Sequence, residues 1–533
     1  MSETTSRTIL FFLSVTLALV LLSNIPLLYG YLALSPELKF MGIVAGVRDA
    51  NFYFMMMAQA DGWNPILRNY FACGEPDAIY HGFFWFFLGK LGNWLGLSPL
   101  VMYHGFRIGA TVAFVPASYY VVSRFLRSRA ERVVATLMVA FGAGAGWVMM
   151  PLRFSGLPFV PVDVGTPEAS SFFTLMTFPH LSCALILIGV CAGLLWDSFR
   201  GGSLWPALTA GVLGLILGFI HAVNLVVIFA VVGAFVVVSL GLGEKRPMRA
   251  ALIFGAVSVW SLAYYVYLSL TKPELLPQAP VRSPTPLSYL VGFAPFLVLA
   301  AIHVGALVRK RAFPGEDVFL LCWVGVNSAL LYSYPLLAQE ARAVLGLQIP
   351  LATLAARSIF GTILPGIGLG GDGAVEEGRR AAAVLVVGLL VIFTFPSTFY
   401  NIYERVWRLK HFPATFSLTR DEYEGLEFIR DHQEGGAVLS GEWIGNYVPR
   451  LTRRHAWLGQ YDIPSYEYRL REVMRFFGRD ASASERYDFL TRNGISFIYY
   501  GAEEKRLGRF EPAEASYLKL AFQKGDVSVF LVE

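Results

Sequence analysis

Apolar runs long enough to cross a bilayer recur from Ile9 to Tyr400 of this 533-residue chain. A transmembrane helix needs about 20 predominantly apolar residues in a row, and repeated runs of that length leave very few folds open. Hydrophobic residues make up 55% of the sequence and charged residues 15%, with a mean hydropathy of +0.54. A soluble protein would carry about 25% charged residues. The sequence therefore predicts a polytopic α-helical membrane protein.

Lys and Arg gather between the apolar runs, as they do in the cytoplasmic loops of membrane proteins. The clusters are Arg124/Arg127/Arg129/Arg132, Arg200, Lys245/Arg246/Arg249, Arg309/Lys310/Arg311 and Arg379/Arg380. All of them face the cytoplasm under one assignment of about eleven spans. These spans are 9–30, 101–123, 133–151, 171–195, two within 204–240, 250–270, 287–308, 317–335, 343–360 and 381–399. Because residues 204–240 must begin and end inside, we expect two short spans that turn near His221.

The aromatic segment 81–97 (HGFFWFFLGKLGNWLGL) is not a full crossing in this scheme. Glycines, Lys90 and Asn93 interrupt it, and Phe and Trp prefer the depth of the membrane interface. We expect a helix that lies in the outer interface, within an outer loop 31–100. If the segment were a span, every later loop would invert and the arginine clusters would face outward.

The apolar runs stop before the last part of the chain, which divides it into two predicted domains. Residues 1–410 form the membrane domain and residues 415–533 a small soluble α/β domain. The soluble part opens with a helical pattern in which Thr419 is a cap and Glu422 follows three residues later. Strand patterns at 437–441, 495–501 and 527–533 alternate with further helical patterns. The charge scheme places this domain on the extracytoplasmic side of the cell membrane.

Composition also bears on some other functions. The four cysteines (Cys73, Cys183, Cys191 and Cys322) show no metal-ligand spacing, and we expect no disulfide framework. The net charge of +5 is modest, and no basic stripe alternates with aromatic residues. Nucleic acid is therefore not an expected partner, whereas membrane lipids are.

The sharpest candidate for chemistry is Asp49, in the segment GVRDANFYFMMM just beyond the first span. A carboxylate at the membrane face is costly unless it is used or solvated. Asp49 could act as a general base or hold a metal ion. The alternative is a solvated acid that pairs with Arg48. The other acids of this loop, Asp61, Glu75 and Asp77, are expected to be solvated surface residues.

Three more polar residues lie where spans meet the outer face. His180 and His221 are near the outer ends of apolar runs, where polar side chains tend to face a cavity. The alternative for both is a buried and satisfied histidine. Arg342 begins a late span and could bind a phosphate through two nitrogens. Its alternatives are a salt bridge to Glu340 or a role as an interfacial anchor. His104 and His303 are expected to be structural.

The layout resembles the GT-C superfamily of integral membrane glycosyltransferases, which use polyprenyl-phosphate-linked sugars. One span leads into an outer loop with an early aspartate (RDANFY), and an aromatic helix precedes a span that ends in basic residues (YYVVSRFLRSRAERV). A histidine lies in a break between two short spans (LGFIHAVNLVVIF), and an arginine opens a late span (EARAVLGLQIP). A soluble outer domain completes the layout. The resemblance covers most of the chain.

The resemblance implies roles for four residues. Asp49 would be the catalytic base or would bind a metal that positions the acceptor, and Arg342 would contact the donor phosphate. His221 and His180 would line the donor cavity. Arg48 and Tyr53, which lie near Asp49 in the same loop, are further candidates for binding substrate. Family members often carry an Asp-Glu or Asp-x-Asp pair in this loop, but Ala50 and Asn51 follow Asp49. A metal site with two carboxylates is therefore not evident, and a divalent cation is an open alternative. The WWD-type motif of oligosaccharyltransferases is absent.

The expected function is transfer of a hexosyl or pentosyl group from a polyprenyl-phosphate donor at the outer membrane face. The acceptor would be a lipid, a glycan or a protein, and the resemblance implies inversion at the anomeric carbon. Two other functions are kept as alternatives. One is a transporter or flippase of lipid-linked saccharides, which would show inverted repeats. The other is a non-catalytic envelope assembly protein whose outer domain binds a partner.

Overall fold

The computed structural model describes residues 3–73, 78–150, 159–273, 280–369, 377–460, 463, 465–478 and 481–533. The chain divides into two compact units, each assembled from separate stretches of sequence. Unit 1 comprises Met1–Ile25, His104–Tyr267 and Pro280–Arg405. Unit 2 comprises Pro26–Tyr103, Leu268–Ala279 and Val406–Glu533. Unit 2 therefore joins the first loop of the chain to its C-terminal part.

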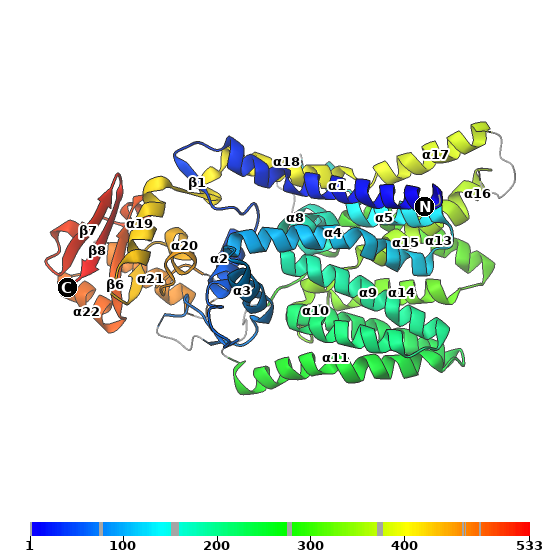
Figure 1. Cartoon of the computed structure of the whole chain (residues 1–533), viewed down its shortest axis with the longest axis horizontal. Helices are drawn as coiled ribbons and strands as arrows, with labels where there is room; N and C mark the ends of the chain where they lie inside the picture. The colour runs from blue at the N-terminus through cyan, green and yellow to red at the C-terminus, as the bar shows by residue number, and fades with distance from the viewer. Residues whose placement is uncertain are drawn as a thin grey trace. The chain divides into compact units, whose positions relative to one another are not determined.

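Unit 1 is built from long helices that run alongside one another (Figure 1). The division between the units falls within four of the described helices, α1 (Glu3–Ala33), α4 (Pro99–Phe125), α11 (Arg246–Thr271) and α18 (Pro396–His411). The other long helices are α5 (Arg129–Phe141), α9 (Pro179–Gly201), α10 (Trp205–Gly241), α13 (Ala294–Lys310), α14 (Gly315–Leu330), α15 (Gln348–Ser358) and α17 (Glu377–Ile392). Short helices α6 (Gly146–Met149), α7 (Val162–Gly165), α8 (Ser171–Thr177), α12 (Pro286–Gly292) and α16 (Leu364–Gly366) connect them.

Eight helices in the described part of the chain are long and apolar enough to cross a membrane. The number is nine if α12 and α13, which meet at an angle of 81°, form one broken span. The expected count of about eleven is not confirmed. One reason is α14, whose 16 residues give only about 24 Å at 1.5 Å per residue. Another is α10, which counts as one helix although it was expected to be two spans.

The backbone of α10 leaves the helical region at His221 (φ −155°, ψ 81°). Residues on either side of this break contact the same part of α11. A Cβ on Gly214 would lie 2.8 Å from the Phe254 ring, and the rings of Phe229 and Phe254 are 5.2 Å apart. In a straight helix, Gly214 and Phe229 would be separated by about 22 Å. The two halves of α10 therefore fold back on each other at His221, where the sequence predicted a turn.

The expected span 171–195 begins later than predicted. Helix α8 ends at Thr177, Phe178 is extended, and α9 starts with Pro179. A proline disfavours helical geometry in the residue before it and suits the first helical position. This break places His180 in the first turn of α9.

Unit 2 contains the C-terminal sheet and its helices. The sheet has the order β5-β6-β8-β7, with β5 (Ala437–Leu439) parallel to β6 (Ile495–Tyr500), and β8 (Val527–Val532) antiparallel to both β6 and β7 (Leu518–Lys524). The helices are α19 (Arg420–Asp431), α20 (Glu442–Thr452), α21 (Tyr466–Phe477), α22 (Ala483–Arg492) and α23 (Ala502–Leu507). Thr419 and Glu422 form the predicted capping box at α19.

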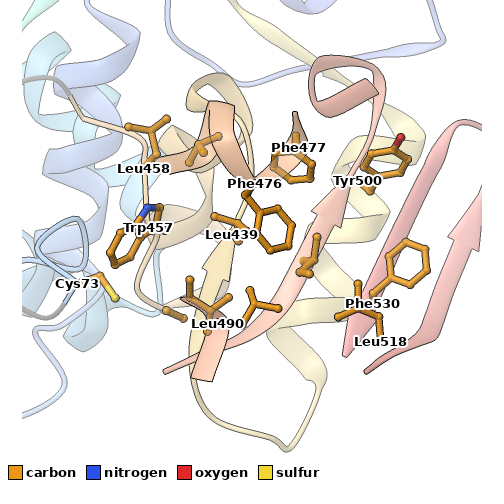
Figure 2. Close-up of a cluster of buried hydrophobic side chains, with 14 residues drawn as sticks. Cys73, Leu439, Trp457, Leu458, Phe476, Phe477, Leu490, Tyr500, Leu518 and Phe530 are labelled. Atoms are coloured by element: carbon orange, nitrogen blue, oxygen red, sulfur yellow. The ribbon is translucent and has the colours of Figure 1, made fainter. Parts of the chain in front are cut away.

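The first loop contributes β1 (Leu38–Phe40), α2 (Val47–Met57), β2 (Leu67–Arg68), β3 (Ala78–Ile79) and α3 (Phe83–Leu95) to unit 2. Strand β1 pairs antiparallel with β4 (Ser417–Thr419) of the C-terminal part. Cys73 of the same loop packs among core side chains of the C-terminal part, including Trp457 and Leu490 (Figure 2). Helix α3 covers most of the aromatic segment 81–97 and has 13 residues, about 20 Å. That length is less than the hydrocarbon thickness of about 30 Å.

Candidate functional site

A buried polar cluster forms in unit 1 around the turn of α10. His221 is at the turn, and Asn224 follows one helical turn later with its side-chain nitrogen 2.8 Å from His221 Nδ1. His221 is 7% exposed and Asn224 is fully buried. Arg342 lies close enough to both His221 and His180 for its charge to act on them, and His221 lies equally within range of His180. The structure therefore brings together three of the predicted site residues and adds Asn224, which the sequence reading had not singled out.

Arg342 lies in a short 3₁₀ helix, Glu340–Val344, that is fixed from several sides. Asn327 of α14 donates its amide to the carbonyl oxygen of Ala343 (2.6 Å). The Glu340 carboxylate accepts from the backbone N–H groups of Tyr334 (2.7 Å) and Ser283 (3.3 Å). These contacts hold the backbone on both sides of Arg342.

The expected alternative of an Arg342–Glu340 salt bridge does not occur. Glu340 lies 3.8 Å from Arg282, and Arg342 has no ion-pair partner in the described part of the chain. Within the same described ranges, three polar atoms of the cluster are buried without a hydrogen-bond partner: His221 Nε2, Asn224 Oδ1 and Arg342 Nε. An unsatisfied buried polar atom costs about 1–3 kcal/mol, so such a group of atoms indicates a site for a polar ligand. A guanidinium beside an imidazole N–H suits an anion such as a phosphate.

Asp49 belongs to unit 2, in the first turn of α2 and half-buried. The N-terminal turn of a helix favours a negative charge, because its free N–H groups point outward. Gly46 takes a left-handed conformation (φ 59°) as the N-cap and offers no capping side chain. Tyr53, one turn after Asp49, stacks on Trp85 of α3 with 4.0 Å between ring centroids. No group of three His, Cys, Asp or Glu side chains among the described residues could hold a metal ion.

Helix α2 is attached to α20 of the C-terminal part by polar contacts. Arg48 pairs with Glu442 at 2.7 Å. Asn51 is fully buried; its amide donates to Asn446 Oδ1 (2.6 Å), and its own oxygen accepts from Arg450 (2.9 Å). Arg450 also donates to the carbonyl oxygen of Met41 (2.9 Å). These contacts, which we call the α2–α20 clamp, fix the helix that carries Asp49. They join residues about 400 positions apart, so no local sequence pattern indicates them.

Other polar residues named from the sequence form ion pairs or lie outside the described residues. Asp61 is 63% exposed at its side chain and pairs with Arg453 at 3.0 Å, as expected of a surface acid. Glu75 and Asp77 lie outside the described residues. His303 is not a lone histidine: its Nε2 is 3.0 Å from Asp317, which also pairs with Arg357 at 2.7 Å. This buried triad is a second polar network of unit 1, and the sequence reading missed it.

Comparisons with known proteins bear on the fold. No protein-family model and no curated protein sequence matches the chain. Solved structures do match. The oligosaccharyltransferase AglB of Archaeoglobus fulgidus, solved with an inhibitory peptide and a dolichol-phosphate, has a TM-score of 0.61 at 11% identity, covering 92% of this chain and 69% of its own. ArnT of Cupriavidus metallidurans has a TM-score of 0.54 at 13% identity, covering 99% of this chain and 98% of its own.

The mycobacterial arabinofuranosyltransferase AftD has a TM-score of 0.58 at 13% identity, covering 98% of this chain and 40% of its own. ArnT has also been solved with undecaprenyl phosphate bound, and that structure matches with a TM-score of 0.52 at 11% identity. These proteins are GT-C glycosyltransferases. At such low identity the likeness concerns the fold, and the fold predicted from the sequence resemblance is confirmed.

Proposed function

We propose that this chain, which has the GT-C fold, transfers a sugar from a polyprenyl-phosphate donor to an acceptor hydroxyl or amide at the outer membrane face. The observation that carries the proposal is the unit 1 cluster, in which Arg342 has no carboxylate partner among the described residues and buried donors face no acceptor. A phosphate supplies both the missing negative charge and the missing acceptors. Lipid phosphates bound to AglB and ArnT support this choice of ligand.

Asp49 is the proposed base. It takes the proton of the acceptor group while the acceptor atom bonds to the anomeric carbon. The bond from that carbon to the phosphate oxygen breaks, and its electron pair stays on the phosphate. The donor, a phosphodiester with one negative charge, thus becomes a phosphomonoester with two. Arg342 stabilises this gain of charge, which is the kind of interaction that lowers a barrier. A single displacement of this kind inverts the anomeric configuration.

Arg48 and Tyr53 have a supporting part in this proposal. Both flank Asp49 on α2, and their contacts with Glu442 and Trp85 orient that helix. A divalent cation would need further ligands from substrate or water, because Asp49 is not part of a group of three or more His, Cys, Asp or Glu side chains among the described residues. The C-terminal part, residues 415–533, is proposed to lie outside the cell and to position α2 through the clamp.

The test uses the purified full-length chain with labelled polyprenyl-phosphate sugars and membrane extract as the source of acceptors. We expect the wild type to release the label into a product, and Asp49→Asn and Arg342→Met to lose transfer. Asp61→Asn is the matched control, because Asp61 is an exposed acid of the same loop. Transfer by Asp49→Asn at the wild-type rate would refute the role of the base. Transport of the intact lipid-linked sugar across a vesicle membrane, without transfer of the sugar, would refute the proposed enzymatic function.

A further inference from the structure

We propose that His221 acts as a neutral hydrogen-bond donor to the leaving phosphate oxygen, and that Asn224 sets the tautomer that makes this possible. The proposal rests on the function proposed above and adds a catalytic residue and a positioning residue to it.

The hydrogen bond determines which ring nitrogen carries the proton. The Asn224 side-chain nitrogen lies 2.8 Å from His221 Nδ1, and an amide nitrogen can only donate. Nδ1 must then accept, which puts the single proton of the neutral imidazole on Nε2. His221 therefore presents an N–H group, not a lone pair, at Nε2.

The Nε2–H group is buried and has no acceptor in the part of the chain that the structure describes. His221 as a whole is 7% exposed, so bulk water does not replace a protein partner. A purely structural histidine would account for the Asn224 contact at Nδ1. It would not account for a buried donor on the other side of the ring, which costs about 1–3 kcal/mol when unmet.

The turn of α10 explains how this N–H group comes to be available. Within a regular helix the His221 ring would lie against the preceding turn. The break at His221 (φ −155°, ψ 81°) releases the ring from that position, while Asn224 anchors its near edge from the next turn. Asn224 selects the tautomer, and Arg342 supplies the charge that attracts a phosphate to the ring. An anion between Arg342 and Nε2–H satisfies both.

The chemistry of the transfer favours a hydrogen-bond donor beside the leaving phosphate oxygen. The phosphate gains one negative charge as the glycosidic bond breaks, so a hydrogen bond to it strengthens in the transition state. Removing one such donor from an enzyme costs about 100- to 1,000-fold in kcat. His221 would thus act on kcat and on affinity for the product, the lipid phosphate, more than on affinity for the lipid-linked sugar substrate.

Two substitutions at position 221 separate this role from a structural one. In His221→Gln the side-chain amide nitrogen reaches the place of Nε2. The shorter side chain of His221→Asn reaches only the place of Nδ1, where its oxygen accepts from Asn224. We expect His221→Gln to keep kcat within about 10-fold of wild type and His221→Asn to lose about 100-fold. A structural role predicts the opposite order, because only Asn preserves the contact with Asn224. Equal activities, or better activity in His221→Asn, would overturn the proposal.

Asn224→Leu tests the positioning residue, because it keeps the volume and removes the amide. Without the hydrogen bond to Nδ1 the two tautomers become similar in energy, and we expect the kcat of Asn224→Leu to fall while its thermal midpoint stays that of wild type. His303→Gln is the matched control, a buried histidine in the other polar network of unit 1. A loss of transfer in His303→Gln equal to that in His221→Asn would show a general packing effect and overturn the assignment.

A binding measurement keeps this inference distinct from the proposed function. Dissociation constants of the full-length chain in detergent are measured for undecaprenyl phosphate and dolichyl phosphate. Wild type that binds neither lipid and transfers no sugar would refute the proposed function itself. Wild type that binds one of them, with unchanged affinity in His221→Asn, would refute only the role of His221. We expect His221→Asn to bind at least 10-fold more weakly and His221→Gln to bind as wild type does.

Discussion

Replacing Arg450 by Met should loosen the segment that carries Asp49 more than any other single change in the α2–α20 clamp. Arg450 donates to Asn51 Oδ1 and to the Met41 carbonyl oxygen, both at 2.9 Å, and its guanidinium lies 4.3 Å from the centre of the Phe54 ring. Burial lowers the pKa of Arg450 to about 10, so the group stays charged at pH 7. Met keeps the stem of the side chain in place and removes only the head.

The magnitude follows from these contacts. A hydrogen bond from a charged group contributes about 1.5–3 kcal/mol, and the two bonds together contribute about 3 kcal/mol at the lower value. That energy corresponds to a roughly 100-fold rise in the population of the opened segment, at 1.36 kcal/mol for each factor of ten. Arg48→Met removes the ion pair with Glu442, whose side chains are 39% and 23% exposed. Exposed pairs are worth about 0.2–1 kcal/mol, which is less than about 6-fold.

Hydrogen exchange of the full-length chain in detergent measures both effects. We expect amides of 47–57 to exchange about 100-fold faster in Arg450→Met and only a few-fold faster in Arg48→Met. Amides in β6 and β8 should keep their rates, since neither substitution touches the sheet. Equal rates in the two variants would refute the argument that the buried arginine, and not the closer ion pair, holds α2. If Asp49 is the base, kcat should fall in the same order.

Two further predictions concern stability. Burial and the neighbouring Glu503 raise the pKa of Glu504 from 4.5 to about 7, so the folded chain holds more protons than the unfolded chain between these values. The free energy of unfolding should therefore fall by about 3 kcal/mol as pH rises from 4.5 to 7. In Glu504→Gln the thermal midpoint should change little with pH across this window. The same fall with pH in the variant as in wild type would contradict the assignment. In α10, a Cβ on Gly218 would collide with Ser261, whereas one on Gly233 would meet nothing within 4 Å. Gly218→Ala should cost about 1–3 kcal/mol and Gly233→Ala should be neutral or stabilising, as thermal unfolding in detergent will show.

Hydropathy and charge were sufficient to predict the features that depend on local sequence. The turn near His221 follows from the need to return residues 204–240 to one side, and the structure has it. The start of the span at 171–195 was wrong because the apolar run hides the effect of Pro179 on the preceding residue. The eleven-span count depended on treating α14 as a full crossing, and hydropathy alone does not register that it has only 16 residues.

The contacts that build the candidate site were harder to predict for a physical reason. Asn224 is visible in the sequence three residues after His221, but only the broken helix brings its amide to Nδ1. Arg450 and Glu442 look like ordinary polar residues of a soluble helix. Their partners lie in a loop near the other end of the chain, and long-range pairing leaves no periodic pattern in a single sequence. Local patterns therefore single out Asp49, Arg342 and the histidines as candidates, but not the residues that hold them.

The long-range contacts of unit 2 also set an order of events during biosynthesis. Arg469 of α21 donates hydrogen bonds to the carbonyl oxygens of Phe71 and Cys73, 398 and 396 residues earlier in the chain. Translation at about 5–20 residues per second separates the two ends of these bonds by roughly 20–80 s. For that interval the loop that carries Asp49 has left the ribosome without the surface on which it folds. The nascent chain therefore cannot bring its proposed base into a fixed position until most of its helices have already been made.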